Sequence, residues 1–403
     1  MEVFVARQPI FDRKRSVVAY ELLFRSGPEN FFDLSQDPDI ACSRIISDQL
    51  HVFEDGVTNG RRAFINTTRR ILVDGMIEML PPANTVVEIL EDVEPDPELL
   101  RAIKGLKQAG YKIALDDFVY RPSLKPFIEL ADIIKIDFLT TQGRDRVRIA
   151  RQLQRQKITL LAEKVETVDD FREAYQAGYS MFQGYFFCRP EMISRQSIPA
   201  FKGNYLKLLS VLNKPDINFN QVAEIIRLEP SLSVKLLKYL NSAAFGLRQR
   251  VSSIRQGLVL LGHQPLKKWA SLVALTGIGE DKPPELVLTA LQRARMCELI
   301  AESSSLKPRT FDLFLVGLFS VMDAMVNRPM DELIGSLGLA QDVHDALVFR
   351  NNPMGHALAL CQHYAEGEWD KACAVSNRLG LQEKRLPEMY QESLGWAEQI
   401  NAV

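Results

Sequence analysis

Acidic and amide side chains recur where short apolar runs of the first half of the chain end. The run 112–115 is followed at once by Asp116 and Asp117, two carboxylates that repel each other unless a cation lies between them. Further oxygen donors stand in or after other apolar runs: Glu21, Asn66 and Glu88. Mg²⁺ and Mn²⁺ prefer such hard donors, whereas zinc sites usually contain cysteine or histidine. The sequence therefore predicts a divalent-metal site built from several strands.

Three further side chains could carry out chemistry beside such a site. Lys135 could place a positive charge on a phosphate or give a proton to a leaving oxygen. Glu163 could complete the metal shell or act as a base, and Gln183 could orient a water molecule. Two close metal ions can bridge an attacking water and a phosphoryl oxygen. A lone acidic residue at a strand end is usually a helix cap or a surface charge, so the hypothesis of phosphodiester hydrolysis depends on recurrence across strands.

The elements that must position these residues alternate between strands and helices. Strands are expected at 3–11, 17–24, 62–66, 85–90, 112–118, 132–137, 159–166 and 180–187, and helices at about 37–53, 97–109, 145–156 and 169–177. This alternation predicts parallel βαβ units. A β/α barrel is favoured, because its strands all end at one mouth. The competing fold is a doubly wound open sheet, which concentrates ligand contacts at one switch point.

The second half of the chain has a different pattern. Strand signals stop after Pro190, and amphipathic helices are expected at 198–212, 219–228, 231–241, 252–261, 265–277, 284–303, 310–327, 331–337, 341–349, 355–378 and 385–401. We therefore expect an α/β domain at 1–195 and an all-α domain at 196–403. The all-α domain would comprise an inner bundle at about 200–280 and C-terminal helices at about 284–403.

Bulk composition narrows the function classes. With 403 residues, a net charge of −2 and a pI near 6.3, the chain is not expected to bind nucleic acid. Its five cysteines are scattered without CxxC spacing, which favours a reducing compartment over a zinc cluster. Neither a signal peptide nor a membrane span is expected. These features predict a cytoplasmic protein.

The ordered motifs of the first half resemble those of the EAL domain over about residues 1–195. The motifs are Gln8-Pro-Ile10, Glu21-Leu-Leu-Phe-Arg25, Glu88-Ile-Leu-Glu91, Asp116-Asp-Phe118, Lys135-Ile-Asp137, Ala162-Glu-Lys-Val-Glu166 and Gln183-Gly-Tyr-Phe-Phe-Cys-Arg-Pro190. The EAL family comprises metal-dependent phosphodiesterases that linearise the bacterial messenger cyclic di-GMP on an EAL-type β/α (TIM-like) barrel. The resemblance thus implies cyclic di-GMP as the ligand and Mg²⁺ or Mn²⁺, in a two-metal site, as the cofactor.

The resemblance also assigns roles by position. Metal-ligand roles fall on Glu21, Asn66, Glu88, Asp116 and Asp117. Catalytic places fall on Lys135, Glu163 and Gln183, supporting places on Glu91 and Glu166, and dinucleotide contacts on Gln8 and Arg25.

Two departures from the family pattern bear on activity. The signature triplet is Glu-Leu-Leu instead of Glu-Ala-Leu, which keeps the carboxylate. The family's Gly-rich loop, which couples metal binding to dimerisation, is replaced by Val119-Tyr-Arg-Pro-Ser-Leu124. A β-branched residue and a proline remove backbone freedom that glycines provide. Hydrolysis and a non-catalytic effector role, in which the barrel binds the dinucleotide or serves only as a scaffold, both stay open, as does a homodimer.

The second half resembles the HDOD domain, most strongly over 200–280. The resemblance rests on the run from Glu229 to Gly246, on Val251–Ile254 and on Leu260-Leu-Gly262. HDOD domains are helical relatives of the HD phosphohydrolases that lack their metal ligands, and this chain has Ser320 and Val321 where a His-Asp pair would stand. The resemblance implies a regulatory module that binds a protein partner.

Overall fold

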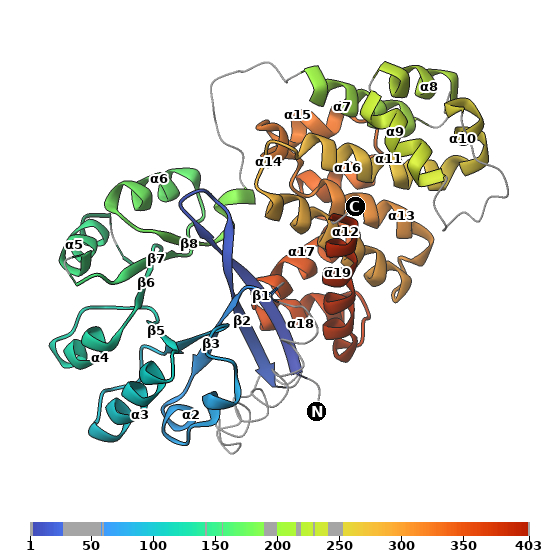
Figure 1. The fold of residues 1–403 in the computed structure, drawn as a ribbon. Coiled ribbons are helices and arrows are strands. Elements are labelled where there is room, and N and C mark those ends of the chain that lie inside the picture. Colours follow the sequence, from blue (N-terminus) through green and yellow to red (C-terminus); the bar gives the residue numbers. More distant parts are fainter. Residues whose placement is uncertain are drawn as a thin grey trace. The chain divides into compact units, whose positions relative to one another are not determined.

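The computed structural model describes residues 3–26, 58, 60–141, 143–154, 156–188, 200–214, 219–228, 230–240 and 253–401 (Figure 1). The chain forms two compact units. The first contains Met1–Arg189 together with Gln362–Ala374 and Gln382–Gly395, and the second contains Pro190–Cys361, Val375–Leu381 and Trp396–Val403. The unit with the N-terminal half thus includes two short segments from the C-terminal helices. The division of the chain into domains at 195 and 196 stays a prediction.

Eight strands close into a barrel in chain order. They are β1 (Val3–Asp12), β2 (Val17–Ser26), β3 (Arg62–Thr67), β4 (Thr85–Ile89), β5 (Lys112–Leu115), β6 (Ile133–Asp137), β7 (Thr159–Glu163) and β8 (Met181–Gln183). Strand β1 is antiparallel to both neighbours, β2 and β8, whereas the pairs from β2 to β8 are parallel. The predicted β/α barrel is therefore confirmed, and the open sheet is excluded.

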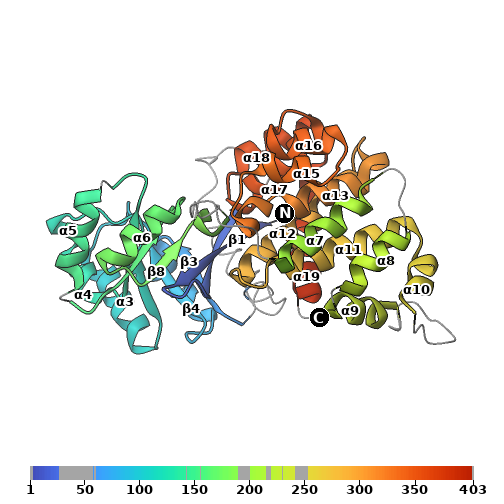
Figure 2. The same cartoon turned by 90° about the horizontal axis from the view of Figure 1, so that it is seen from above.

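Burial explains why these segments form strands. Every residue of β4 and β6 is buried, including the charged Glu88 and Lys135. A cluster of inward-facing residues fills the barrel interior: Ile10, Ala19, Phe64, Val86, Ala114, Ile133 and Leu161. The barrel helices lie outside the strands, as Figures 1 and 2 show. They are α2 (Arg69–Val73), α3 (Pro97–Gln108), α4 (Lys125–Leu130), α5 (Gly143–Gln154) and α6 (Val168–Ala177).

Local capping fixes where the barrel helices begin and end. Asp96 caps α3 by accepting hydrogen bonds from the N–H groups of Glu98 and Leu99. Thr167 and Asp170 form a capping box at the start of α6, and Gly178 ends this helix in the left-handed conformation. These caps set the loops that lead into and out of the neighbouring strands.

Three strands end three or four residues earlier than predicted, and each ends at a candidate site residue or directly before one. Strand β5 stops at Leu115, because Asp117 has a left-handed backbone with φ +38°. Strand β7 stops at Glu163, before Lys164 with φ +52°. Strand β8 stops at Gln183, before Gly184 with φ +134°. The turns begin at the barrel mouth, where the polar side chains stand.

The remaining helices are α7 (Ala200–Leu212), α8 (Phe219–Leu228), α9 (Pro230–Leu240), α10 (Ile254–Leu261), α11 (His263–Ile278), α12 (Pro284–Glu302), α13 (Thr310–Phe319), α14 (Met322–Val326), α15 (Met330–Ser336), α16 (Gln341–Val348), α17 (Pro353–Ala365), α18 (Trp369–Arg378) and α19 (Leu386–Asn401). The single helices predicted at 310–327 and 355–378 are wrong, because each is two helices. Val321 (φ −127°, ψ 19°) interrupts the first, and Gly367 (φ +71°) interrupts the second. The helix expected at about 37–53 lies outside the described residues.

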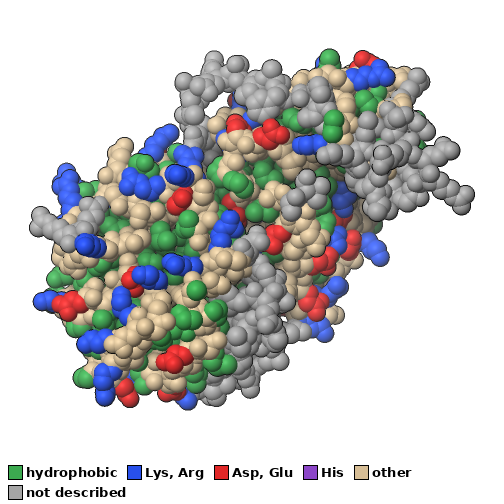
Figure 3. All heavy atoms as spheres, in the orientation of Figure 1, with side chains coloured by type: hydrophobic (Ala, Val, Ile, Leu, Met, Phe, Trp, Pro, Cys, Tyr) green, Lys and Arg blue, Asp and Glu red, His purple; other side chains and the backbone are tan. Residues whose placement is uncertain are grey.

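Surface and helix properties bear on two further expectations. None of the helices in the described ranges is both long and apolar enough to cross a bilayer. On the face drawn in Figure 3, basic and acidic side chains are interspersed. The absence of a nucleic-acid partner stays a prediction, based on the net charge of −2.

Candidate active site

Strand register brings the candidate residues together at one mouth of the barrel. Gln8 on β1 is paired with Glu21 on β2, and Asn66 on β3 is paired with Glu88 on β4. On β6 and β7, Asp137 is paired with Glu163. Asp116 follows the last residue of β5 directly. Because parallel strands of a barrel end at the same face, these side chains can meet.

Lys135 lies at the centre of the cluster and is fully buried. Its Nζ is 2.7 Å from a carboxylate oxygen of each of Glu88, Asp116 and Glu163. A fourth carboxylate, that of Glu21, is 3.4 Å away. These contacts join strands that are far apart in the sequence. They confirm that the carboxylates converge, although each residue's role stays a prediction.

Glu21 is held by three donors. Its Oε1 accepts a hydrogen bond from Asn66 Nδ2 at 3.2 Å, and its Oε2 accepts one from Gln183 Nε2 at 2.6 Å. The third donor is Lys135. Gln183 Nε2 also donates to Gln8 Oε1 at 2.9 Å. The predicted metal ligand, water-orienting and dinucleotide-binding residues therefore form one hydrogen-bonded network.

Burial and mutual repulsion shift the protonation of the cluster. Burial raises the pKa of Glu88 well above its usual range, and Glu21 and Asp116 raise it further against the opposing effect of Lys135. Burial also raises the pKa of Glu163 to about 8. Burial alone would lower the pKa of Lys135, but the four surrounding carboxylates raise it well above its usual value. Lys135 is therefore charged, and its single positive charge is shared by four carboxylates.

Asp117 stands at the edge of the cluster. Burial raises its pKa, and Lys164, whose Nζ is 3.6 Å from Asp117 Oδ2, opposes that shift. Lys164 also forms an ion pair with Asp137, the last residue of β6. Lys164 lies within the Ala162–Glu166 motif, but its residue type alone predicts no role for it. Its left-handed backbone places the ammonium group between two acidic strand ends.

The donor set fits a divalent cation. One ligand atom from each of Asp116, Asp117 and Glu163 can be chosen so that the three lie within 4.8 Å of one another. Asn66 Oδ1, Glu88 Oε2 and Asp117 Oδ1 are buried without a hydrogen-bond partner among the described residues. A buried oxygen without a donor is costly. An ion with oxygen ligands would remove that cost, so the residues present fit Mg²⁺ or Mn²⁺.

The other predicted site residues lie at the rim or outside the described region. Glu91 and Glu166 are exposed, and each follows a strand that carries a cluster residue. Gln8 is half-buried, and its Nε2 donates to the backbone oxygen of Glu366 at 3.2 Å. The side chain of Arg25 lies outside the described residues. The roles of all four stay predictions.

The rebuilt loop at 119–124 is tied down by Arg121. Its Nη2 donates to the backbone oxygen of Glu91 at 2.9 Å, and its Nη1 forms a 3.0 Å ion pair with Glu94. Val119 and Tyr120 beside it are exposed. A cavity of about 210 Å³ adjoins the loop, and its lining includes Leu90, Asp116, Asp117, Phe118, Arg121 and Phe127. The loop therefore reaches the Asp pair, and no sequence pattern had marked Arg121.

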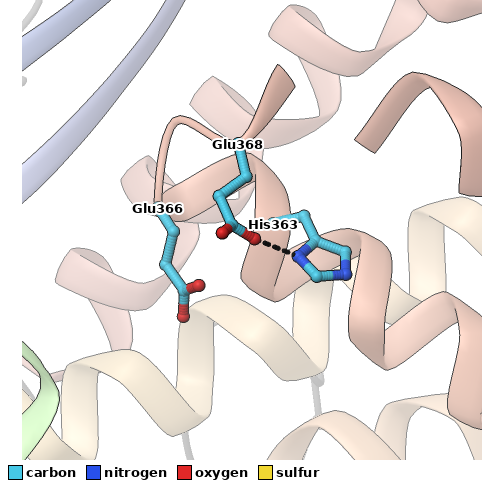
Figure 4. A group of neighbouring side chains, drawn as sticks. All are labelled: His363, Glu366 and Glu368. Atoms are coloured by element: carbon cyan, nitrogen blue, oxygen red, sulfur yellow. Dashed lines mark hydrogen bonds and ion pairs between the residues drawn. The ribbon is translucent and has the colours of Figure 1, made fainter. Parts of the chain in front are cut away.

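A second group of potential ligand atoms lies on the turn between α17 and α18. His363 at the end of α17, with Glu366 and Glu368 after it, offers one ligand atom from each residue within 4.8 Å of the others, and Figure 4 shows Glu368 bonded to His363. Both oxygens of Glu368 already have partners, because Oε2 lies 2.6 Å from His363 Nδ1 and Oε1 lies 2.6 Å from Lys371 Nζ. These bonds close the turn by themselves, so we assign no metal to it.

Ser320 and Val321, which stand where metal-dependent relatives of the HDOD domain would carry a His-Asp pair, lie in the second compact unit. Ser320 is buried and accepts a hydrogen bond from Arg293 Nη1 at 3.4 Å. Arg293 itself is only 3% exposed. A buried guanidinium beside this position disfavours a cation there. Residues 241–252, which carry part of the HDOD-like pattern, lie outside the described residues.

Comparisons with known proteins agree with the two resemblances. The EAL domain matches residues 52–190, and the HDOD domain matches residues 198–327. The cyclic di-GMP phosphodiesterase CdgJ of Vibrio cholerae is 36% identical over 406 residues, which cover 99% of this chain and 93% of that protein. The uncharacterised protein YuxH of Bacillus subtilis is 35% identical over 408 residues and 99% of each chain.

Among solved structures, the chain is similar to the Bacillus subtilis YkuI protein, which has an EAL domain and was solved with its substrate cyclic di-GMP and calcium. The identity is 19%, the coverage is 56% of this chain and 73% of that chain, and the TM-score is 0.40. The full-length sequence matches carry the assignment. This chain belongs to the family of proteins in which an EAL domain is followed by an HDOD domain.

Proposed function

We propose that the chain acts in cyclic di-GMP signalling and that its barrel hydrolyses cyclic di-GMP to linear pGpG. One observation carries the proposal: side chains from seven strands or the loops after them meet around Lys135. This buried cluster holds carboxylate and amide oxygens that have no hydrogen-bond partner among the described residues. Phosphodiester hydrolysis needs such a charge distribution. The full-length similarity to CdgJ, which is named a cyclic di-GMP phosphodiesterase, supports the choice of substrate.

Mg²⁺ or Mn²⁺ would be held by oxygens of the convergent set. Asn66, Glu88 and Asp117 offer buried oxygens that accept no hydrogen bond within the part of the chain that the structure describes. Glu21 and Asp116 would complete the ligands. When bound, divalent ions supply Lewis-acid polarisation of the phosphoryl oxygen and lower the pKa of a water molecule. The hydrogen bonds from Asn66 and Gln183 fix the orientation of Glu21.

The chain's own residues would do the rest. Gln183 would orient the attacking water, and Glu163 would accept its proton as the oxygen attacks phosphorus. The bond from phosphorus to a ribose oxygen would then break, and Lys135 would neutralise the negative charge that develops on this oxygen, which takes a proton from solvent to become a hydroxyl. Lys135 is suited to this role because the surrounding carboxylates keep it protonated. Gln8 and Arg25 would contact the dinucleotide.

A second function, binding without hydrolysis, is favoured by the loop at 119–124. Arg121 ties this loop to the backbone of Glu91, next to the Asp pair. A loop fixed in this way can shift Asp117 away from the geometry that turnover requires. The barrel would then be a cyclic di-GMP effector or a scaffold.

Incubation of the purified full chain with cyclic di-GMP and Mn²⁺ or Mg²⁺ tests the proposal. We expect linear pGpG, and we expect Glu21→Ala to abolish it. Glu129→Gln, which changes an exposed carboxylate on α4 of the same barrel, should match the wild type. Binding without product would support the effector instead. Product formation that survives in Glu21→Ala, or neither binding nor product, would overturn the proposal.

We propose that the HDOD domain is a regulatory module for a protein partner and does not hydrolyse phosphoesters. The Arg293–Ser320 contact supports this, because it puts a cation where related hydrolases hold a metal. The cysteine pattern supports a cytoplasmic location. Incubating a barrel-inactive Glu21→Ala protein with phosphate esters and Mn²⁺ should give no product, and turnover would contradict this assignment. A homodimer stays open and can be tested by measuring the mass in solution.

A further inference from the structure

One edge of strand β1 is covered by C-terminal residues of the same compact unit. Strand β1 pairs with β8 only from Ile10 to Asp12. Before that point, the backbone N–H of Arg7 donates to Tyr390 Oη at 3.4 Å, and Gln8 Nε2 donates to the Glu366 oxygen at 3.2 Å. A strand edge needs such partners. Both C-terminal segments, 362–374 and 382–395, belong to the barrel's unit.

This covering reaches the candidate active site through two side chains. Gln8, held by Glu366 at one end, accepts a hydrogen bond from Gln183 at the other, at 2.9 Å. Gln183 in turn donates to Glu21 at 2.6 Å. The backbone oxygen of Glu366, 358 positions from Gln8 in the sequence, thus holds the Gln8 side chain, which is linked through Gln183 to the predicted metal ligand Glu21.

The turn that supplies this oxygen has little freedom. Its backbone closes through bonds from Gly367 N to Tyr364 O at 3.1 Å and from Glu368 N to His363 O at 2.8 Å. The His363–Glu368 bond drawn in Figure 4 closes it again through side chains. Gly367 has φ +71°, and a Cβ at this position would lie 2.6 Å from Leu23 Cδ1 on β2. The left-handed backbone at this position favours glycine, and an added Cβ would also make the Leu23 side chain or the turn shift.

We propose that the α17–α18 turn, residues 364–368, is a positioning element of the barrel's site. By holding Gln8, and through it Gln183, it sets the affinity of the site for the dinucleotide. This inference rests on the proposed function and adds a regulatory input to it, because any event that lifts the turn weakens substrate binding. The turn acts on the site through the hydrogen bond from Gln8 Nε2 to the Glu366 oxygen, and Gln8 is a predicted dinucleotide contact, so KM should change more than kcat.

Substitution of Gly367 by alanine tests the proposal. The added Cβ would lie 2.6 Å from Leu23 Cδ1, so the Leu23 side chain or the turn must shift. Displacement of the turn with loss of one or two hydrogen bonds should raise KM, or Kd if there is no turnover, by about 3- to 10-fold. Gly380→Ala is the matched control, because Gly380 has φ +70° and its Cβ would meet no atom within 4 Å. Glu368→Gln loosens the same turn without a clash and decides the matter if Gly367→Ala does not fold. Both should raise KM relative to Gly380→Ala.

A double-mutant cycle with Gln8→Ala shows whether the turn acts through this side chain. We expect the effect of Gly367→Ala, or of Glu368→Gln, to vanish in the Gln8→Ala background. Provided that the wild type binds cyclic di-GMP, two results would overturn the inference. One is a turn substitution that changes KM or Kd as much in the Gln8→Ala background as in the wild type, and the other is an unchanged KM and Kd in both turn variants. A wild type that neither binds nor hydrolyses the dinucleotide would instead refute the proposed function, and the inference with it.

Discussion

Replacement of Lys135 by methionine removes the ammonium group that contacts four carboxylates inside the barrel. Lys135 is 0% exposed, and three of its carboxylate partners lie at 2.7 Å. Loss of one partner from a buried ion pair typically costs about 3–5 kcal/mol, because the opposite charge is left buried. We expect a loss of this size in the free energy of unfolding when divalent ions are chelated. Lys112→Met removes an equal charge from an exposed position of the barrel and should cost at most about 1 kcal/mol.

The loss should depend on pH. Burial raises the pKa of Glu163 from 4.5 to about 8, so between these values the folded protein keeps a proton that the unfolded chain has released. Stability therefore falls as pH rises through this range. Removal of Lys135 takes away an influence that lowers the pKa of Glu163 and of Glu88. The gap between variant and wild type should accordingly be smaller at pH 5 than at pH 8.

Urea unfolding in EDTA and in Mn²⁺ measures both effects. Mn²⁺ at about 100 times its Kd should restore about 2.7 kcal/mol to any folded form that binds it at one site. If Lys135→Met unfolds with the same midpoint as Lys112→Met, the buried ammonium does not neutralise the carboxylates and the reasoning fails. If Mn²⁺ leaves the free energy of unfolding of both the wild type and the variant unchanged, the carboxylates do not form an ion site.

Three further single substitutions test other residues of the barrel and its loops. Burial alone would raise the pKa of Asp132, but hydrogen bonds from Lys107, Lys112 and the Ile113 N–H lower it. Asp132→Asn should therefore lower the free energy of unfolding by about 1–2 kcal/mol at pH 7. The difference in urea midpoint between variant and wild type should fade as pH falls below about 4, and a constant difference would contradict this. Gly184 has φ +134°, and in Gly184→Ala the added Cβ would lie 2.2 Å from the backbone oxygen of Val165. The substitution should lower the free energy of unfolding by at least about 2 kcal/mol and reduce hydrolysis by displacing Gln183. A melting temperature and a hydrolysis rate like those of the wild type would refute this. Arg121→Ala loses an exposed ion pair worth at most about 1 kcal/mol, so melting should change little while KM for cyclic di-GMP rises, and an unchanged KM would remove the loop from the site.

Periodicity and residue type predicted the barrel and the convergence of its polar side chains. Strand alternation follows from local burial, and the polar residues at the strand ends needed only the barrel's common mouth to meet. The shortened strands could not be predicted in the same way. Asp117 and Lys164 adopt left-handed backbones, which residue type does not predict at these positions. Tertiary contacts hold them in this conformation.

The C-terminal covering of β1 had no local signal. The contact between Gln8 and Glu366 joins residues 358 positions apart through a backbone oxygen, so neither residue type marks it. Gly367 alone could have indicated the break in the helix predicted at 355–378, because glycine favours the left-handed conformation that ends helices. A single glycine within an otherwise helical pattern is tolerated in many proteins. Here both the φ of +71° and the close approach to Leu23 Cδ1 favour it.

In the proposed function, side chains from different strands form one divalent-ion site. Titration of the metal-free full chain with Mn²⁺, followed by electron paramagnetic resonance of the free ion, measures this most directly. We expect Mn²⁺ to bind to the wild type, at up to two ions per chain, and binding to weaken at least about 10-fold in Glu88→Gln while Glu129→Gln matches the wild type. Mn²⁺ that stays free in the wild type, or that binds Glu88→Gln equally well, would contradict the claim.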